Sequence, residues 1–223
     1  KAVTQLNLLQ PEFVMSVGDL IEGYTESRDT LKQQYDEMDE ILSDLEMRFF
    51  RVPGNHDIGN DVMLDMYRER YGLPYYHFVY KDVLFLVIST EDPPYGNISD
   101  IQVNYIQKAL KENMNVRWTF VFFHRPYFYW NEEDKADGYV KIVNMLKDRP
   151  HTAFAGHAHQ YKKVEIHGQT YIGLATTGGI SELRGTEFGE FDHIVWVTMT
   201  DTGPIIANLM LDGIFDENIK IAE

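Results

Sequence analysis

In the segment Phe49-Phe50-Arg51-Val52-Pro53-Gly54-Asn55-His56-Asp57, an apolar run leads directly into polar side chains. Three other segments repeat this arrangement, each behind a short apolar run: Val17-Gly18-Asp19-Leu20, Phe123-His124-Arg125-Pro126 and Gly156-His157-Ala158-His159. Such runs are typical of buried strands. In layered α/β proteins, sites gather in the loops at the carboxyl ends of strands. We therefore expect the four polar segments to converge.

Taken singly, each segment has a simpler explanation. The turn at Gly54-Asn55-His56-Asp57 could bond its own backbone through its Asn and Asp side chains. His157 and His159 could be alternating positions of one strand, one exposed and one buried. These readings leave the order and placement of all four segments unexplained, so the combination favours a site.

The four segments supply a recognisable set of metal ligands. The set has one carboxylate, one amide oxygen and three imidazoles, from Asp19, Asn55, His124, His157 and His159. This mixture suits zinc, manganese or iron better than calcium or magnesium. The chemistry it suggests is metal-assisted hydrolysis.

In type and order, the segments resemble the motifs of the calcineurin-like metallophosphoesterases, a superfamily of phosphatases and phosphodiesterases with a dinuclear metal centre. The motifs span residues 18–159, and hairpin-like segments extend the resemblance to residue 211. The resemblance implies a four-layer α/β sandwich in which two facing mixed β-sheets are flanked by helices. We expect a single domain of this kind over residues 1–223, with the family's first strand missing.

The same resemblance implies a role for each ligand. Asp19 would bridge the two metals, and Asn55, His124 and His157 would complete the second metal site. His159 would belong to the first metal site. A hydroxide bridging the metals would attack the phosphorus of a small phosphoester substrate, either a monoester or a diester.

Other residues would act on the substrate. The resemblance implies that His56 stands near the substrate and protonates the leaving group or stabilises the transition state, and that Asp57 orients His56. Arg125 and Arg184 could hold phosphate oxygens bidentately, or each could form a surface or structural ion pair. The aromatic loop at residues 127–131 could stack on a flat leaving group or pack against the next helix.

One family motif is absent. The Asp-x-His that supplies two further ligands of the first metal does not occur before Asp19. The first site then keeps only Asp19 and His159, so of two cations we expect one to be held strongly. A catalytically impaired metal- or phosphate-binding module that keeps the fold is the alternative to an active enzyme. A purple acid phosphatase is not expected, because Glu22 stands where that group has tyrosine.

Composition limits the class of protein and its partners. A length of 223 residues with 44% hydrophobic content predicts one domain with a sizeable core. The net charge of −15 argues against nucleic acid as a partner. No apolar run has the 18 or more residues of a membrane span, and the chain has no cysteine. The compartment stays open between cytoplasm and export with a signal upstream of Lys1, as does the oligomeric state.

Periodicity predicts the remaining elements. Helices are expected at residues 3–9, 30–47, 99–110 and 138–147, the third opened by a capping box at Ser99-Asp100-Ile101-Gln102. The acidic residues of the second helix are expected to form a solvated face. Alternation predicts antiparallel strands at residues 161–166, 169–176, 192–200 and 205–211.

Overall fold

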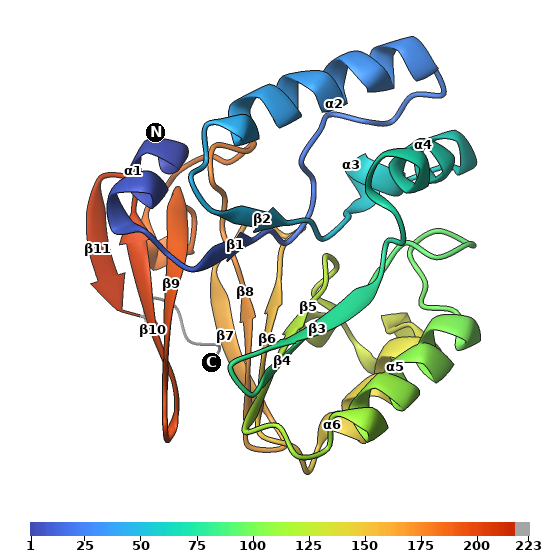
Figure 1. Cartoon of the computed structure of the whole chain (residues 1–223), viewed down its shortest axis with the longest axis vertical. Coiled ribbons are helices and arrows are strands. Elements are labelled where there is room, and N and C mark those ends of the chain that lie inside the picture. The colour runs from blue at the N-terminus through green and yellow to red at the C-terminus, as the bar shows by residue number, and fades with distance from the viewer. Residues whose placement is uncertain (217–223) are drawn as a thin grey trace.

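The computed structural model describes residues 1–216 as a layered α/β structure, shown in Figure 1. Its largest sheet has six strands in the order β3-β4-β5-β6-β8-β7. Their bounds are β3 (Tyr76–Tyr80), β4 (Val83–Val87), β5 (Trp118–Phe122), β6 (His151–Ala155), β7 (Lys162–Ile166) and β8 (Gln169–Gly173). The four inner strands are parallel to one another, and the edge strands β3 and β7 are antiparallel to their neighbours. The predicted α/β class is confirmed.

Two smaller sheets form the layer that faces the large one. β1 (Phe13–Met15) pairs in parallel with β2 (Arg48–Phe50). β9 (His193–Thr200), β10 (Gly203–Met210) and β11 (Gly213–Asp216) form an antiparallel sheet. The facing layer, expected as one mixed sheet, is therefore divided in two within residues 1–216.

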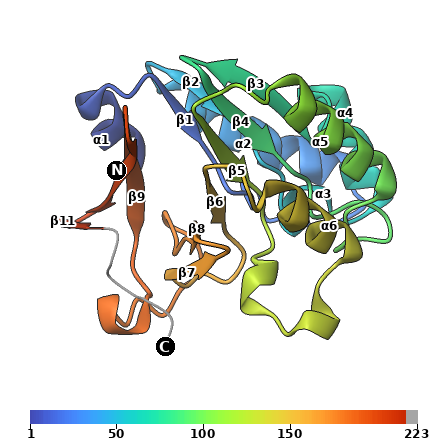
Figure 2. The same cartoon turned by 90° about the horizontal axis from the view of Figure 1, so that it is seen from below.

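Alternation along the inner strands divides the core between the two faces of the large sheet. Leu84 and Leu86 point to the face covered by α5 (Asp100–Glu112) and α6 (Asp137–Leu146). Val83 and Val87 point to the face covered by the smaller sheets, where Val52, Phe191 and Ile206 meet them. Figure 2 shows α5 and α6 on one side of the large sheet and β9 on the other.

Aromatic rings join β1 and β2 to the large sheet. The ring of Phe13 lies edge-on to that of Phe85, with centroids 5.0 Å apart. The ring of Phe50 stacks on Phe78 with centroids 4.4 Å apart. Each such pair contributes about 0.5–1.5 kcal/mol beyond the burial of apolar area. The short parallel pair is thus fixed by its contacts across the layers more than by its own few hydrogen bonds.

The remaining helices lie outside the smaller sheets. They are α1 (Ala2–Leu9), α2 (Arg28–Ser43), the single turn α3 (Asn55–Ile58) and α4 (Asp61–Tyr71), with short 3₁₀ turns at Tyr127–Tyr129, Glu132–Asp134 and Thr186–Phe188. α1 connects the two smaller sheets. Asn7 on α1 hydrogen-bonds the backbone of Asp44 and Glu46 ahead of β2, and Gln5 donates to the carbonyl of Leu211 after β10.

Two predicted helices differ in detail from the structure. The acidic helix expected to reach residue 47 ends at Ser43. At α5, Ser99 caps the helix by accepting from the Gln102 amide, as predicted. The side chain of Gln102 does not return to the Ser99 backbone, however, because it is buried and hydrogen-bonds Ser89 and Asp92 instead. The predicted capping box is therefore only half formed.

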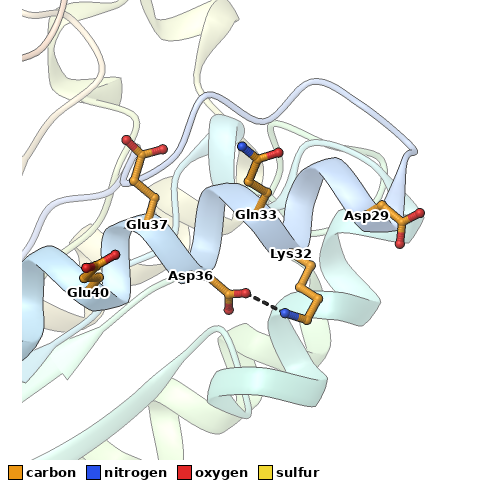
Figure 3. Close-up of a pocket in the computed structure, with 6 residues that line it drawn as sticks. All are labelled: Asp29, Lys32, Gln33, Asp36, Glu37 and Glu40. Atoms are coloured by element: carbon orange, nitrogen blue, oxygen red, sulfur yellow. Dashed lines mark hydrogen bonds and ion pairs between the residues drawn. The ribbon is translucent and has the colours of Figure 1, made fainter.

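The acidic face of α2 is shown in Figure 3. Six exposed side chains of this face line a shallow hollow: Asp29, Lys32, Gln33, Asp36, Glu37 and Glu40. Within it, Lys32 forms an ion pair with Asp36, one helical turn away. Exposed pairs of this kind contribute little to stability. The prediction of a solvated acidic face is confirmed for these residues, whereas Asp39, also expected on that face, is half-buried and pairs with Arg51 and Arg70. Among the helices of residues 1–216, none has both the length and the apolar character to cross a bilayer.

His193 forms a buried polar contact at the start of β9. Its Nδ1 lies 2.8 Å from Asn208 Oδ1, and its Nε2 accepts the Ala175 amide at 3.2 Å. A neutral ring with its hydrogen on Nδ1 satisfies both partners. A second proton would point at an N–H donor in a site that water does not reach. Burial lowers the pKa of His193 to about 4.

We predict that this ring makes stability depend on pH. Its contribution is complete above the unfolded pKa of 6.5 and is lost as the pH falls toward 4, because only the unfolded chain takes up the proton. His193→Gln should flatten the decline in the free energy of unfolding over that range by up to about 1.4 kcal/mol per pH unit. Urea unfolding in EDTA measures this slope. The exposed His167→Asn serves as control, and equal slopes for wild type and His193→Gln would contradict the prediction.

Candidate metal centre

Four loops bring the candidate ligands to one edge of the two facing layers. Asp19 follows β1, Asn55 opens α3 after β2, His124 follows β5, and His157 follows β6. β1 and β2 are parallel, as are β5 and β6, so the carboxyl ends of each pair lie together. This convergence is the one that the sequence predicts.

The ligand atoms of these four residues form a compact cluster. His124 Nε2 lies 3.0 Å from Asp19 Oδ2 and 3.0 Å from Asn55 Oδ1. His157 Nδ1 lies 2.8 Å from Asn55 Oδ1 and 3.2 Å from His124 Nε2. One ligand atom from each of Asp19, His124 and His157 lies within 4.8 Å of the other two. Ligands of a tetrahedral ion at about 2.0–2.1 Å are separated by about 3.4 Å, so the cluster has the size of a metal site.

The cluster contains more acceptors than hydrogens to share among them. His124 Nδ1 lies 2.7 Å from the carbonyl oxygen of Val17, which can only accept, so Nδ1 carries the hydrogen. The other nitrogen of His124 then presents a lone pair, or at most one proton, to Asp19, Asn55 and His157. Two oxygens and two ring nitrogens facing one point need a positive charge between them. The donor set therefore fits a cation.

Electrostatics favour the metal-binding form of Asp19 and His157, whereas a proton on His124 would have to leave before a metal binds. Burial opposes charge on Asp19, but the hydrogen bond and charge of His124 hold its pKa below the usual value. Burial likewise opposes charge on His124, and Asp19 outweighs it and raises the pKa of that ring. Burial, with the positive charges of His124 and Arg125, lowers the pKa of His157 to about 4. His157 is therefore a neutral imidazole at neutral pH, which is the form that binds metals.

The backbone at the site is held in an uncommon conformation. Asp19, His157 and His159 have φ values of 58°, 65° and 52°, in the left-handed region. Non-glycine residues in this region cluster at functional sites. Gly54 faces Asp19 so closely that a Cβ there would lie 2.2 Å from Asp19 Oδ1. A side chain at position 54 would thus displace the carboxylate.

Asp57 has a different role from the one expected. Its buried carboxylate accepts the backbone amides of Asp19 at 2.8 Å, Leu20 at 3.0 Å and Gly54 at 2.8 Å. Burial raises the pKa of Asp57 to about 6, although these donors oppose the shift. The expectation that Asp57 orients His56 is wrong, because its carboxylate is committed to backbone amides. Asp57 instead fastens the loop after β1 to the loop after β2.

His56 and His159 lie outside the four-ligand cluster. His56 Nδ1 donates to the carbonyl of Glu22 at 2.6 Å, so that carbonyl orients the ring and leaves Nε2 as the nitrogen available to other partners. The His159 Nδ1 lies 2.6 Å from the carbonyl of Ile180. The structure thus separates these two histidines from His124 and His157, and the roles assigned to them remain predictions.

Both candidate phosphate-binding arginines already pair with carboxylates. Arg125 holds the buried Glu91 bidentately, through Nε at 2.6 Å and Nη2 at 3.0 Å. Arg184 pairs with Glu190, with Nε at 2.7 Å, and its guanidinium lies over the ring of Phe188. Arg125 remains close enough to the cluster to affect His157. Phosphate binding by either arginine stays a prediction.

The aromatic loop after His124 mainly packs against the protein. The hydroxyl of the buried Tyr127 donates to Gly96 O, and that of Tyr129 donates to Lys162 O. Phe128 packs against the core of the large sheet. Trp130 differs, because its ring lies 6.3 Å from that of His157. Of this loop, Trp130 is therefore the aromatic beside the metal ligands.

Sequence reasoning missed three partners of the site. They are the Val17 carbonyl that fixes the His124 tautomer, the Glu22 carbonyl that orients His56, and Tyr24, whose hydroxyl lies 2.5 Å from Asn55 Nδ2. Two are backbone atoms, which carry no residue-specific signal. For Tyr24 the only available signal is its place five residues after Asp19.

Comparisons with known proteins identify the family and the fold. The family model of the calcineurin-like phosphoesterases matches residues 1–161. No curated protein matches the chain. Among solved structures, GAP50, the anchor in the inner membrane complex of Plasmodium, is 15% identical with a TM-score of 0.70, covering 100% of this chain and 90% of that one.

Two further structures share the fold. A dimetal phosphatase from Danio rerio is 15% identical with a TM-score of 0.62, covering 96% of this chain and 84% of its own. The purple acid phosphatase PPD1 from yellow lupin is 16% identical with a TM-score of 0.68, and the match covers 96% of this chain but 47% of the lupin chain. At these identities the likeness establishes the fold.

We predict that the folded protein binds a transition metal at the four-ligand cluster. Removing one ligand should weaken binding by more than about tenfold, because the remaining donors no longer enclose the ion. Wild type, His157→Ala and the exposed control His167→Asn are incubated with Zn²⁺ or Mn²⁺, desalted and analysed for metal. Equal metal in wild type and His157→Ala would show that the cluster is not the site.

Proposed function

Because the chain belongs to the calcineurin-like phosphoesterase family, we propose that it is a metal-dependent hydrolase of small phosphoesters. The observation that carries the proposal is the convergence of Asp19, Asn55, His124 and His157 at the carboxyl edge of the strands, with acceptor atoms that fit a cation. A mixed nitrogen and oxygen set of this kind favours manganese, iron or zinc.

The bound cation would supply positive charge to a phosphoryl oxygen and lower the pKa of a coordinated water. The protein residues would hold and orient the reactants. Two neutral imidazoles and one amide leave only a single carboxylate in the cluster, so the site stays positive enough for an anionic ester. Arg125, beside His157, would add positive charge for the phosphate oxygens.

His56 is the candidate general acid. Its Nδ1 hydrogen is committed to the Glu22 carbonyl, so Nε2 is the atom that would carry a transferable proton. The ring is partly exposed and contacts the ring of Tyr24, with centroids 4.3 Å apart. The neighbouring Asn55 is a cluster residue, so a phosphoester bound there would lie near His56. This placement suits protonation of a leaving-group oxygen.

We predict that His56→Ala lowers turnover of an alkyl phosphoester by about 10²–10⁴-fold with metal content unchanged, as for loss of a general acid. The effect should be smaller for nitrophenyl phosphate, whose leaving group needs little protonation. Steady-state kinetics on both esters, with elemental analysis of the same samples, measures this. Loss of metal in parallel with activity would move His56 to the ligand set.

We further predict one tightly bound cation per chain. Within residues 1–216, the cluster at Asp19, His124 and His157 is the only group of three or more titratable ligand side chains close enough to hold an ion. His159 is turned toward Ile180 and would bring few partners to a second ion. Calorimetric titration with Mn²⁺ gives the stoichiometry. Two cations bound with similar affinity would require further ligands and overturn this count.

A second candidate is a binding module that keeps the fold and the metal without turnover. It is favoured by the match to GAP50, a protein described as an anchor, over 100% of this chain. The two candidates differ in one measurement. Metal-loaded wild type that hydrolyses neither mono- nor bis-nitrophenyl phosphate, while still binding inorganic phosphate, would favour the binding module.

A further inference from the structure

The segment Glu22-Gly23-Tyr24 borders the site and lies outside the four polar segments. It contacts His56 and Asn55. The carbonyl of Glu22 accepts from His56 Nδ1, and the amide of Gly23 donates to Gln34 Oε1 on α2 at 2.9 Å. A Cβ at Gly23, whose φ is 63°, would lie 1.8 Å from the carbonyl oxygen of His56. Glycine is therefore required for this close contact. The segment is fixed on one side to α2 and on the other to His56.

Tyr24 is the side chain that this segment presents. Its φ of 48° is in the left-handed region, which is unusual for a bulky residue. Its ring lies against the His56 ring at an interplanar angle of 64°. Its hydroxyl oxygen is 2.5 Å from Asn55 Nδ2, and the residue is 63% exposed. Tyr24 thus contacts a metal ligand through its hydroxyl and the candidate acid through its ring, while much of its surface is exposed.

The direction of the hydrogen bond leaves the Tyr24 proton available. Asn55 turns Oδ1 toward the ring nitrogens of His124 and His157, so its Nδ2 faces Tyr24 and must donate. The Tyr24 oxygen is then the acceptor, and its own hydrogen points elsewhere. Within residues 1–216, that hydrogen has no protein acceptor among the hydrogen bonds observed. A hydroxyl that accepts one hydrogen bond is a stronger donor in the next.

We propose that Tyr24 is a substrate-binding residue, which donates its hydroxyl hydrogen to a phosphoryl oxygen of the bound ester. The proposal rests on the proposed function, since it requires a phosphoester at the metal ligands. The Tyr24 oxygen is 2.5 Å from Nδ2 of Asn55, and so within about 5 Å of the Oδ1 that faces the cation position. A phosphoryl group held at that position lies within reach of the hydroxyl.

Tyr24 would share this task with Arg125. Arg125 directly follows the ligand His124 in the loop after β5. Two of its nitrogens are committed to Glu91. The neutral Tyr24 hydroxyl would therefore supplement the Arg125 guanidinium, whose charge is already partly neutralised by Glu91.

The test separates phosphate binding from metal binding. Mn²⁺ affinity is measured first by calorimetry for wild type, Tyr24→Phe and the control Tyr80→Phe, and phosphate is then titrated at Mn²⁺ concentrations that saturate each protein. Tyr80 lies at the β3–β4 turn, at the amino end of β4 and so opposite the site. Tyr24→Phe keeps the ring against His56 and removes only the hydroxyl. Circular dichroism confirms that each variant is folded.

Tyr24→Phe should bind inorganic phosphate about tenfold more weakly than wild type at saturating Mn²⁺, as expected for one hydrogen bond to a charged group, while Tyr80→Phe should match wild type. Equal phosphate affinity for wild type and Tyr24→Phe would overturn the role of Tyr24 and leave the hydrolase proposal standing. A wild type that binds Mn²⁺, takes up no phosphate and hydrolyses no ester would overturn both.

Discussion

Three backbone amides that donate to the buried carboxylate of Asp57 hold the site together. Two come from the loop after β1, at Asp19 and Leu20, and one from the loop after β2, at Gly54. A buried carboxylate without such donors would be costly, so the two loops are held together by the need to satisfy it. Asp19, whose backbone is in the left-handed region, donates one of these three hydrogen bonds. The position of Asp19 is therefore set by a residue that does not itself face the cation.

A second contact extends this constraint from the smaller β1–β2 sheet to the large one. His124, after β5, donates through Nδ1 to the carbonyl of Val17, after β1. This hydrogen bond crosses between the layers and also selects the nitrogen that faces the cluster. The ligands converge only when both layers are docked, since Asp19 and Asn55 belong to one layer and His124 and His157 to the other. Metal binding is thereby coupled to the packing of the aromatic rings between them.

The sequence predicted features that are determined by short stretches of chain, which are several of the helices and strands and the polar loops that follow the strands. Periodicity predicted α1, α2, α5 and α6, and apolar runs that end in polar residues predicted the convergence of four loops, because strand direction places those ends together. The sequence did not predict α4 or the antiparallel pair β3–β4. It also did not predict contacts that depend on side-chain torsions across loops. Asp57 was expected to bond its neighbour His56, but in the structure it turns to backbone amides, and Gln102 turns inward to Ser89 in the same way. Buried polar groups choose partners by geometry that spacing along the chain does not encode.

The net negative charge of the chain opposes the approach of an anionic substrate to the site. A chain with a net charge of −15 repels an anionic ester at long range, and the exposed face of α2 in Figure 3 is one acidic part of its surface. Such repulsion is screened over about 8 Å at physiological ionic strength. Recognition must therefore come from donors within hydrogen-bonding reach. The cluster contributes a single carboxylate, and Arg125 and the Tyr24 hydroxyl lie beside it. Because these donors act at contact distance, the acidic surface slows encounter with an anionic ester more than it weakens binding.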